Sequence, residues 1–177
     1  MAGQRLTDKT ALEQQAGSGD LLMVVDVNDT TGSSAGTSKK MDFKYVIQTD
    51  KFTLSNADIQ ALHTTPKILV GALSGYMVTP LNVTILTTYA SSTESSANNL
   101  FLGYDSSQDT LYWDKISRIM HSVTESRSYV QCNANPAGGG VYSASIINRP
   151  FEMWSNAAFN GGWSADVYVT YAYTKVL

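Results

Sequence analysis

The sequence predicts a mainly β protein in which a C-terminal antiparallel β-sandwich or jelly roll follows a small α+β module. From residue 67 onward, runs rich in β-branched and aromatic residues alternate with polar breaks such as SSTESSANN, DSSQD and NPAGGG. Before residue 50, a short helical pattern and two strand-like runs stand apart from that region. With 177 residues, 43% of them hydrophobic, the chain is long enough for one core and a small appendage.

A change of pattern between residues 50 and 66 divides the chain. We expect residues 1–50 to form an N-terminal module, residues 51–66 a helical linker and residues 67–177 the β-sandwich. In the linker, Ser55 and Asp58 have the spacing of a capping box, which predicts a short helix through Leu62 that Pro66 ends.

The N-terminal module is expected to begin with a helix. Thr7 or Asp8 can cap it, Leu6 and Leu12 are its apolar anchors, and Gly17 ends it. Its apolar face is weak, so this helix needs a partner surface to be stable.

A β-hairpin follows, because two strand-like runs flank a loop rich in Gly, Ser and Thr. Leu21–Val27 predicts a buried strand, and Lys39–Ile47 alternates as a half-buried strand does. The loop is not a Walker phosphate loop, since its glycines lack the required spacing and it leads into a strand rather than a helix. It is not an EF-hand either, since the twelfth position is Thr37 instead of Glu. Its aspartates are expected to bond backbone groups or to pair with the lysines that follow.

The C-terminal region contains at least six strand-like runs. In the last run, Val167, Val169 and Tyr171 alternate with more polar residues, as in a strand with one buried face. Such runs with irregular polar loops favour an antiparallel sandwich or jelly roll. A short helix over Asp114–His121 is expected beside it.

Composition argues against several classes of partner. The net charge is −3 and no basic patch is present, which argues against nucleic acid and anionic membrane surfaces. No apolar run is long enough for membrane insertion, and the first residues lack the apolar segment of a secretory signal. Charged residues make up only 15% of the chain, which indicates a surface that meets other protein.

No pattern points to catalysis, to a metal or to a cofactor. His63 is expected at a helix end and His121 at an edge or interface, and neither lies near a nucleophile motif. The lone Cys132 excludes a disulfide within the chain and a cysteine-rich zinc site. The scattered acids select no carboxylate pair of the kind a glycosidase needs. We therefore expect a protein that is not an enzyme and holds no cofactor.

The tryptophans leave two alternatives open. Trp113, Trp154 and Trp163 lie near predicted strand ends and loops. Such rings pack in a core or between subunits, or they stack on sugars as in many lectins.

The N-terminal part resembles a segment found near the N-termini of tailed-bacteriophage virion proteins. That segment has a Leu-Thr-x-x-x-x-Leu helix, an acidic residue, a Leu-Leu-x-Val-Val-Asp-Val strand and an Asp-Thr-x-x-x-x-Gly-Thr-Ser-Lys-Lys loop. The corresponding parts of this chain are Leu6 to Leu12, Asp20, Leu21 to Val27 and Asp29 to Lys40.

The C-terminal part is similar to phage fibre or decoration β domains. The matching elements are a helix end, a Leu-rich strand, an Asn-Arg-Pro strand, an Asn/Gly-rich loop and a closing Val-Tyr-Val-Thr-Tyr strand. In this chain they are Ile59, Leu62 and Pro66, then Leu100 to Tyr104, Asn148 to Pro150, Asn156 to Gly162 and Val167 to Tyr171. A Pro-Gly-x-Gly-like turn of that domain type is replaced here by Ala72 to Met77, in which Gly75 keeps the turn.

The resemblance implies a phage virion structural protein, commonly a homotrimer, that is made in the host cytoplasm and lies on the particle surface. As a capsid decoration or head-fibre protein, it would dock on a capsid or tail platform through its N-terminal module. The candidate docking residues are Leu6, Leu12, Asp29, Lys39 and Lys40.

Two other functions remain as alternatives. A receptor-binding tail fibre or tip protein would hold host-surface glycan through the three tryptophans. A glycan depolymerase would need the carboxylate pair that the sequence does not show.

Overall fold

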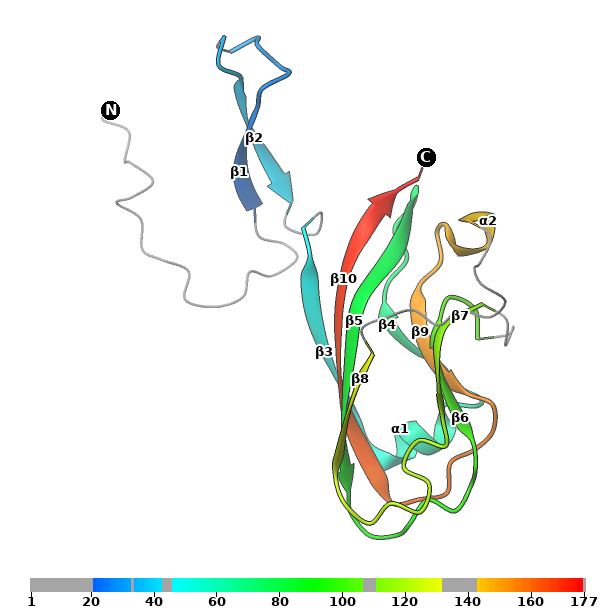
Figure 1. The fold of residues 1–177 in the computed structure, drawn as a ribbon. Coiled ribbons are helices and arrows are strands. Elements are labelled where there is room, and N and C mark those ends of the chain that lie inside the picture. Colours follow the sequence, from blue (N-terminus) through cyan, green and yellow to red (C-terminus); the bar gives the residue numbers. More distant parts are fainter. Residues whose placement is uncertain (1–20, 33, 43–45, 107–110, 132–142, 177) are drawn as a thin grey trace, which may run out of the picture. The chain divides into compact units, whose positions relative to one another are not determined.

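The computed structural model describes residues 21–32, 34–42, 46–106, 111–131 and 143–176 (Figure 1). The chain divides into two compact units, Met1–Val46 and Ile47–Leu177.

The first unit contains the predicted hairpin. Strand β1 (Leu21–Asp26) pairs antiparallel with β2 (Thr37–Asp42), with Leu22 opposite Met41 and Asp26 opposite Thr37. The predicted helix around Leu6 and Leu12 lies outside the described residues.

The second unit is a sandwich of two four-stranded antiparallel sheets (Figure 1). The first, called the β5–β10 sheet, has the order β3 (Gln48–Leu54), β10 (Trp163–Lys175), β5 (Tyr76–Tyr89), β8 (Arg127–Gln131). The second, called the β6–β9 sheet, has the order β4 (Lys67–Val70), β9 (Phe151–Ser155), β6 (Asn99–Gly103), β7 (Tyr112–Ser117).

The strand pairing confirms the predicted fold class and makes it a jelly roll. Strand β3 pairs with β10, β4 with β9, β5 with β8 and β6 with β7, so the pairs are nested inside one another. Two additional pairs complete the sheets. The pair β10–β5 joins β3 and β10 to β5 and β8 in one sheet, and the pair β9–β6 joins β4 and β9 to β6 and β7 in the other. This is the double Greek-key arrangement of jelly rolls.

The core lies between the two sheets, where alternate residues of the long strands meet. Val167 and Val169 of β10 and Val83 and Ile85 of β5 are at most 1% exposed, as the period of two in their sequences requires. The β6–β9 sheet adds Leu102, also fully buried. The alternation predicted for the last strand is therefore confirmed.

Helix α1 (Asn56–Ala61) begins with the predicted capping box. The Ser55 hydroxyl accepts a bond from the Asp58 N–H at 3.2 Å, and the Asp58 carboxylate accepts one from the Ser55 N–H at 2.9 Å. A second helix, α2 (Ser143–Ile146), is a single turn.

One domain boundary and one helix differ from the expectations. Residues 51–66 were expected as a helical linker, but residues 51–54 complete β3 and pair with β10, so this segment belongs to the second unit. The alternating pattern of residues 51–54 is too short to predict a strand by itself, and the capping box at Ser55 follows it directly.

The expected helix over Asp114–His121 is instead the end of β7 and a turn. The apolar residues of this segment have helical spacing, but after Ser117 the backbone is not helical. Arg118, Met120 and Ser122 have left-handed backbone, with φ angles of 53°, 59° and 57°.

The turn before β5 behaves as expected. Gly75 has φ +80°, a left-handed conformation that side chains with a Cβ disfavour. Its N–H donates to Asn148 Oδ1 at 2.6 Å, which joins this turn to the segment before β9.

Candidate docking surface

The hairpin loop is closed by its own polar side chains. Asp26 Oδ1 accepts from the Asn28 N–H at 3.1 Å, and Asp29 Oδ1 accepts from the Thr31 N–H at 3.0 Å. Thr37 Oγ1 accepts from the Gly32 N–H at 3.0 Å. These are turn interactions of Asx and Thr side chains, so the loop is a structural element.

Lys39 belongs to this loop structure. Its ammonium group pairs with Asp29 at 2.5 Å. The bond from Lys39, together with the bonds from Thr31, lowers the pKa of Asp29 to about 2. The expectation that a carboxylate of the same hairpin holds a lysine is therefore confirmed for this residue.

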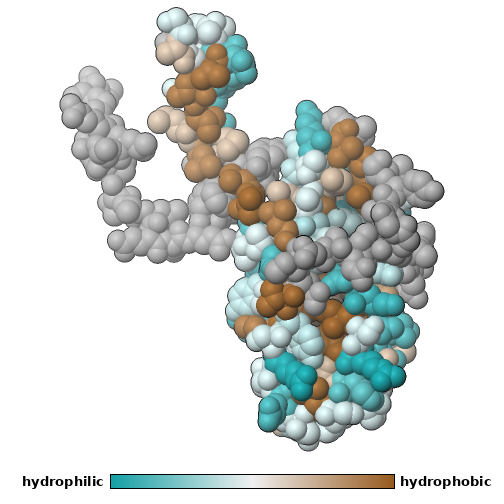
Figure 2. Space-filling view, in the orientation of Figure 1, coloured by the Kyte–Doolittle hydropathy of each residue, from teal (hydrophilic) through white to brown (hydrophobic). Residues whose placement is uncertain are grey.

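Lys40 lies on the other face of the hairpin, here called the exposed hairpin face. Residues directly opposite in an antiparallel pair share a face, and Lys40 stands opposite Met23 while Ser38 stands opposite Val25. The exposed fractions are 70% for Met23, 57% for Val25 and 69% for Val27. Figure 2 shows hydrophobic side chains gathered along this hairpin.

The exposed hairpin face has the properties of a surface that another protein covers. Within the part of the chain that the structure describes, Lys40 makes no ion pair, so the face combines an apolar strip with one available cation. A shallow hollow on the hairpin is lined by Leu22, Met23, Ser38, Lys39 and Lys40. A two-stranded hairpin is marginally stable in water, and contiguous exposed apolar residues are typical of interaction sites.

The sequence identified only part of this surface. Asp29, Lys39 and Lys40 lie in the hairpin, whereas Leu6 and Leu12 fall outside the described residues. Leu21–Val27 was expected to be a buried strand, but alternate residues of this run are exposed. The polar facing strand, TSKKMD, could have indicated this, because a hairpin with one largely polar strand does not form the apolar face of a buried sheet.

The three tryptophans are all buried, with exposed fractions of 8% for Trp113, 2% for Trp154 and 1% for Trp163. Trp113 meets Phe151 edge to face, and Trp154 stacks on Phe101 with a centroid distance of 5.4 Å. None of the three presents an open ring face, so the expectation that they contact glycan does not fit this structure. Their burial fits the packing alternative.

One functional-looking residue that the sequence did not single out is Glu94, a carboxylate that is 1% exposed. Its oxygens accept bonds from the N–H groups of Ser96 at 2.9 Å, Asn160 at 3.0 Å and Gly161 at 2.8 Å. The indole N–H of Trp163 donates to the same carboxylate at 3.3 Å.

The environment of Glu94 keeps its carboxylate ionised. Burial raises the pKa of Glu94, but the bonds from Ser96, Gly161 and Trp163 together outweigh burial and leave the pKa below its ordinary value. A carboxylate held in this way links two loops and is a poor proton donor, so we assign it a structural role.

Within the described ranges, no three His, Cys, Asp or Glu side chains gather in a way that could hold a metal ion. No helix of the described part combines the length and apolar character needed to cross a membrane.

Comparisons with known proteins give little further information. No protein-family model matches the sequence, and no curated protein matches it. Among solved structures, a chain of the capsid asymmetric unit of cyanophage Pam1 is similar at a TM-score of 0.34 and 13% identity, over 96% of each chain. At this TM-score the two folds do not correspond closely enough for function to be carried from one to the other.

Proposed function

We propose that this chain is a non-enzymatic structural protein of a phage virion. In this proposal it is a capsid decoration or head-fibre component whose hairpin module docks on another virion protein. The jelly roll projects from that contact and assembles as a homotrimer on the particle surface.

The observation that carries the proposal is the exposed hairpin face on a unit separate from the jelly roll. The jelly roll already has a complete core, whereas the hairpin leaves Met23, Val25 and Val27 uncovered. Docking would remove this apolar surface from water and stabilise the hairpin at the same time. The resemblance of both parts of the sequence to phage virion proteins supports the same function.

The adjacent lysines have different roles in this proposal. Lys39 shapes the loop through Asp29, and Lys40 is available to a carboxylate of the partner. The partner surface is therefore expected to be an apolar groove with an acidic residue beside it. For the alternative of a glycan-binding tail fibre, no described residue offers comparable support, because the tryptophans assigned to it are buried.

The test is co-sedimentation of the purified full-length protein with particles of the phage that encodes it, prepared from a deletion mutant that lacks it. A Met23→Ser/Val25→Ser double variant should lose most of the binding. The matched control is Ile68→Ser, which changes a jelly-roll residue that is 53% exposed. Equal binding of the double variant and the wild type would contradict docking through this face. Absence of wild-type binding to particles, with binding to host cells instead, would favour the tail-fibre alternative.

A further inference from the structure

We propose that the outer face of the β5–β10 sheet packs against a second copy of this chain. This inference specifies the self-association included in the proposed function, and it does not depend on the hairpin or on the particle. It follows from the arrangement of side chains on that face, from their charges and from their hydrogen bonds.

The strand register arranges the outer side chains of this sheet in rows that cross its strands. The inward residues of β10 belong to the core, so Asp166, Tyr168 and Thr170 face outward. The first row contains Thr53, Asp166, Leu86 and Ser128. The second row contains Lys51, Tyr168, Thr84 and Val130. The third row contains Thr49, Thr170 and Asn82.

The charges in these rows balance within the face. Only Lys51 and Asp166 are charged, and they pair with each other at 2.9 Å. The Lys51 ammonium also lies 5.6 Å from the centre of the Tyr168 ring. Two copies of a face with unbalanced charge would repel each other, whereas two charge-balanced faces do not.

The threonine hydroxyl groups of these three rows already have partners within the face. Thr53 donates to Asp166 at 2.7 Å, and the hydroxyls of Thr49 and Thr170 are 2.9 Å apart. Thr84 donates to Asn82 at 3.0 Å. Removing water from a polar group costs free energy mainly when the group is left without a bond, so this face can be covered at low cost.

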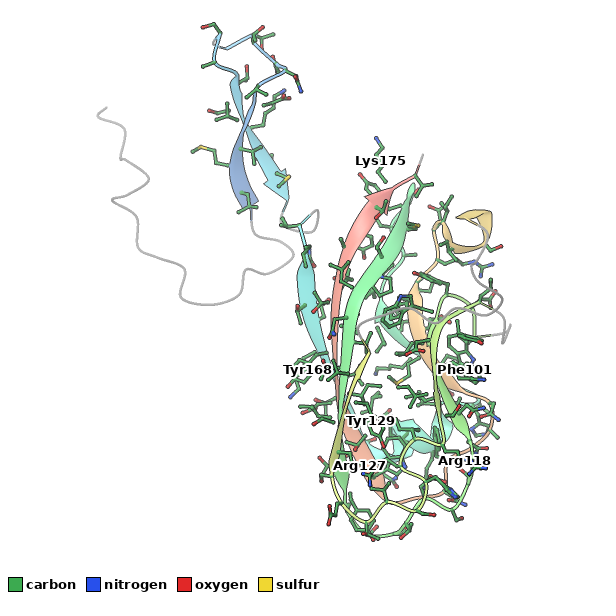
Figure 3. All side chains as sticks on the ribbon, in the orientation of Figure 1. Phe101, Arg118, Arg127, Tyr129, Tyr168 and Lys175 are labelled. Atoms are coloured by element: carbon green, nitrogen blue, oxygen red, sulfur yellow. The ribbon has the colours of Figure 1, made fainter. Side chains whose placement is uncertain are left out.

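The centre of the face is apolar. Leu86 is 38% exposed and Val130 is 54% exposed, and Leu86 is the diagonal neighbour of both Val130 and Tyr168. Figure 3 shows Tyr168 pointing away from the opposite sheet, whereas Tyr129 lies on the inner side. A tyrosine flanked by aliphatic side chains is the type of central anchor that dominates binding at protein interfaces.

The described outer side of the β6–β9 sheet differs in its aromatic residues. It also carries one residue of each charge, Lys115 and Glu152, and an exposed Ile68, but its rings Phe101 and Trp154 are only 4% and 2% exposed. An outward-facing tyrosine among paired threonine hydroxyls is therefore a property of the β5–β10 sheet. That face provides no net charge that would select an acidic or basic partner, and this favours an identical surface as its occupant.

The test uses the full-length protein and two charge variants at the centre of the face. Thr84→Lys places a cation between Tyr168 and Val130, so that two copies would bring cations together or bury one without a partner. Light scattering over a concentration series should show the wild type above its chain mass of 19.2 kDa and the variant near it. We expect the dissociation constant to rise at least about tenfold. Ser117→Lys, at an exposed position of β7, is the matched control and should associate as the wild type does.

The second part of the test mixes two variants of opposite charge. Thr84→Lys and Thr84→Glu should each be dissociated alone and should associate with each other where the face meets itself. Failure of the mixture to associate, with both single variants dissociated, would overturn the pairing of this face with the same face of a second copy. A monomeric wild type at all concentrations, or unchanged association of Thr84→Lys, would overturn it. A monomer that still sediments with particles would leave the docking proposal intact.

Discussion

At the scale of single residues, Glu94 is the side chain whose environment has the clearest energetic consequence. Its charge is balanced by N–H donors of the chain, and two of them, Asn160 and Gly161, come from a loop more than 60 positions away. Gly161 approaches so closely that an added Cβ would lie 2.8 Å from Glu94 Cα, so only glycine fits there without displacement. This carboxylate therefore joins the loop before β6 to the loop before β10.

The first prediction is that Glu94→Gln destabilises the jelly roll by about 1–3 kcal/mol at pH 7, because an amide nitrogen cannot accept the bonds now made to a carboxylate oxygen. The pKa of Glu94 is lower in the folded protein than its ordinary value of 4.5, so near that pH the folded state binds fewer protons than the unfolded state. The ionised Glu94 therefore stabilises the fold fully above pH 4.5, and this contribution is lost as the pH falls through the pKa of the folded protein.

Urea unfolding followed by tryptophan fluorescence measures this effect, since all three tryptophans lie in the second unit. The difference between wild type and variant should be present at pH 7 and should shrink as the pH falls below the ordinary value of 4.5. Glu125→Gln, at an exposed position, is the control. A difference that stays constant over this range would show that the replaced acceptor atom, and not the charge of the side chain, is responsible.

Predictability at this scale depends on whether the partners are close in sequence. The capping box of Ser55 and Asp58 was predicted because both partners lie within one helical turn. Glu94 was not singled out, because its polar segment resembles any loop. Its donors Asn160 and Gly161 lie 66 and 67 positions away in the sequence. The tryptophans remained ambiguous for the same reason, since a ring before a loop is buried or exposed according to the strands that pack over it.

At the scale of elements, two adjacent lysines of the hairpin differ in their contacts. Lys39 pairs with Asp29 of the loop, whereas Lys40 lies on the exposed hairpin face. Lys39→Ala should loosen the loop slightly, because it removes the ion pair with Asp29 and exposed ion pairs contribute little, whereas Lys40→Ala should leave the loop unchanged. Amide hydrogen exchange of Thr31 and Gly32 reports this, with roughly twofold faster exchange expected for the first variant only. Faster exchange in both variants would contradict the division of roles.

The capping box gives a second prediction for an element. Ser55→Ala removes the acceptor for the Asp58 N–H and should lower the free energy of unfolding by about 1 kcal/mol. Thr124→Ala, at an exposed position, is the control in the same urea titration. An unchanged midpoint would mean that packing of Ile59 and Leu62, both 1% exposed, fixes this helix without its cap.

Elements were predicted well where one pattern decides them, and poorly where two patterns overlap. The hairpin and the long alternating β10 follow directly from period and turn composition. The end of β7 was taken for a helix because Ile116, Ile119 and Met120 match both a helical face and a strand followed by a turn. Only the left-handed residues of the turn distinguish the two, and non-glycine side chains rarely indicate such backbone.

At the scale of the whole molecule, the hydrophobic core found among the described residues lies in the second unit. Every residue of the hydrophobic cluster lies between Leu54 and Tyr171. We therefore predict that a fragment of residues 47–177 unfolds cooperatively, with a Tm within about 2 °C of the full-length protein. Thermal melts followed by tryptophan fluorescence test this, and a clearly lower Tm for the fragment would show that the first unit stabilises the second.

The sandwich could be predicted from the sequence, but its strand order could not. Periodicity locates strands and their buried faces, whereas pairing depends on which edges meet after the chain folds over. Thr49 and Thr170, whose hydroxyls are 2.9 Å apart, are separated by 121 positions. No local pattern links such residues, so the nested order of the jelly roll emerges only in three dimensions.

The nested order has a consequence during synthesis. Strand β3 leaves the ribosome more than 100 residues before its partner β10, since Thr49 and Thr170 are 121 positions apart. At about 5–20 residues per second, it waits roughly 6–24 s with its edges unpaired. The strands of the hairpin are joined by a short loop and can pair as soon as they emerge. The nascent chain therefore displays a paired hairpin while the jelly roll is still incomplete, and the unpaired strands can pair with neighbouring chains until the last strand is added.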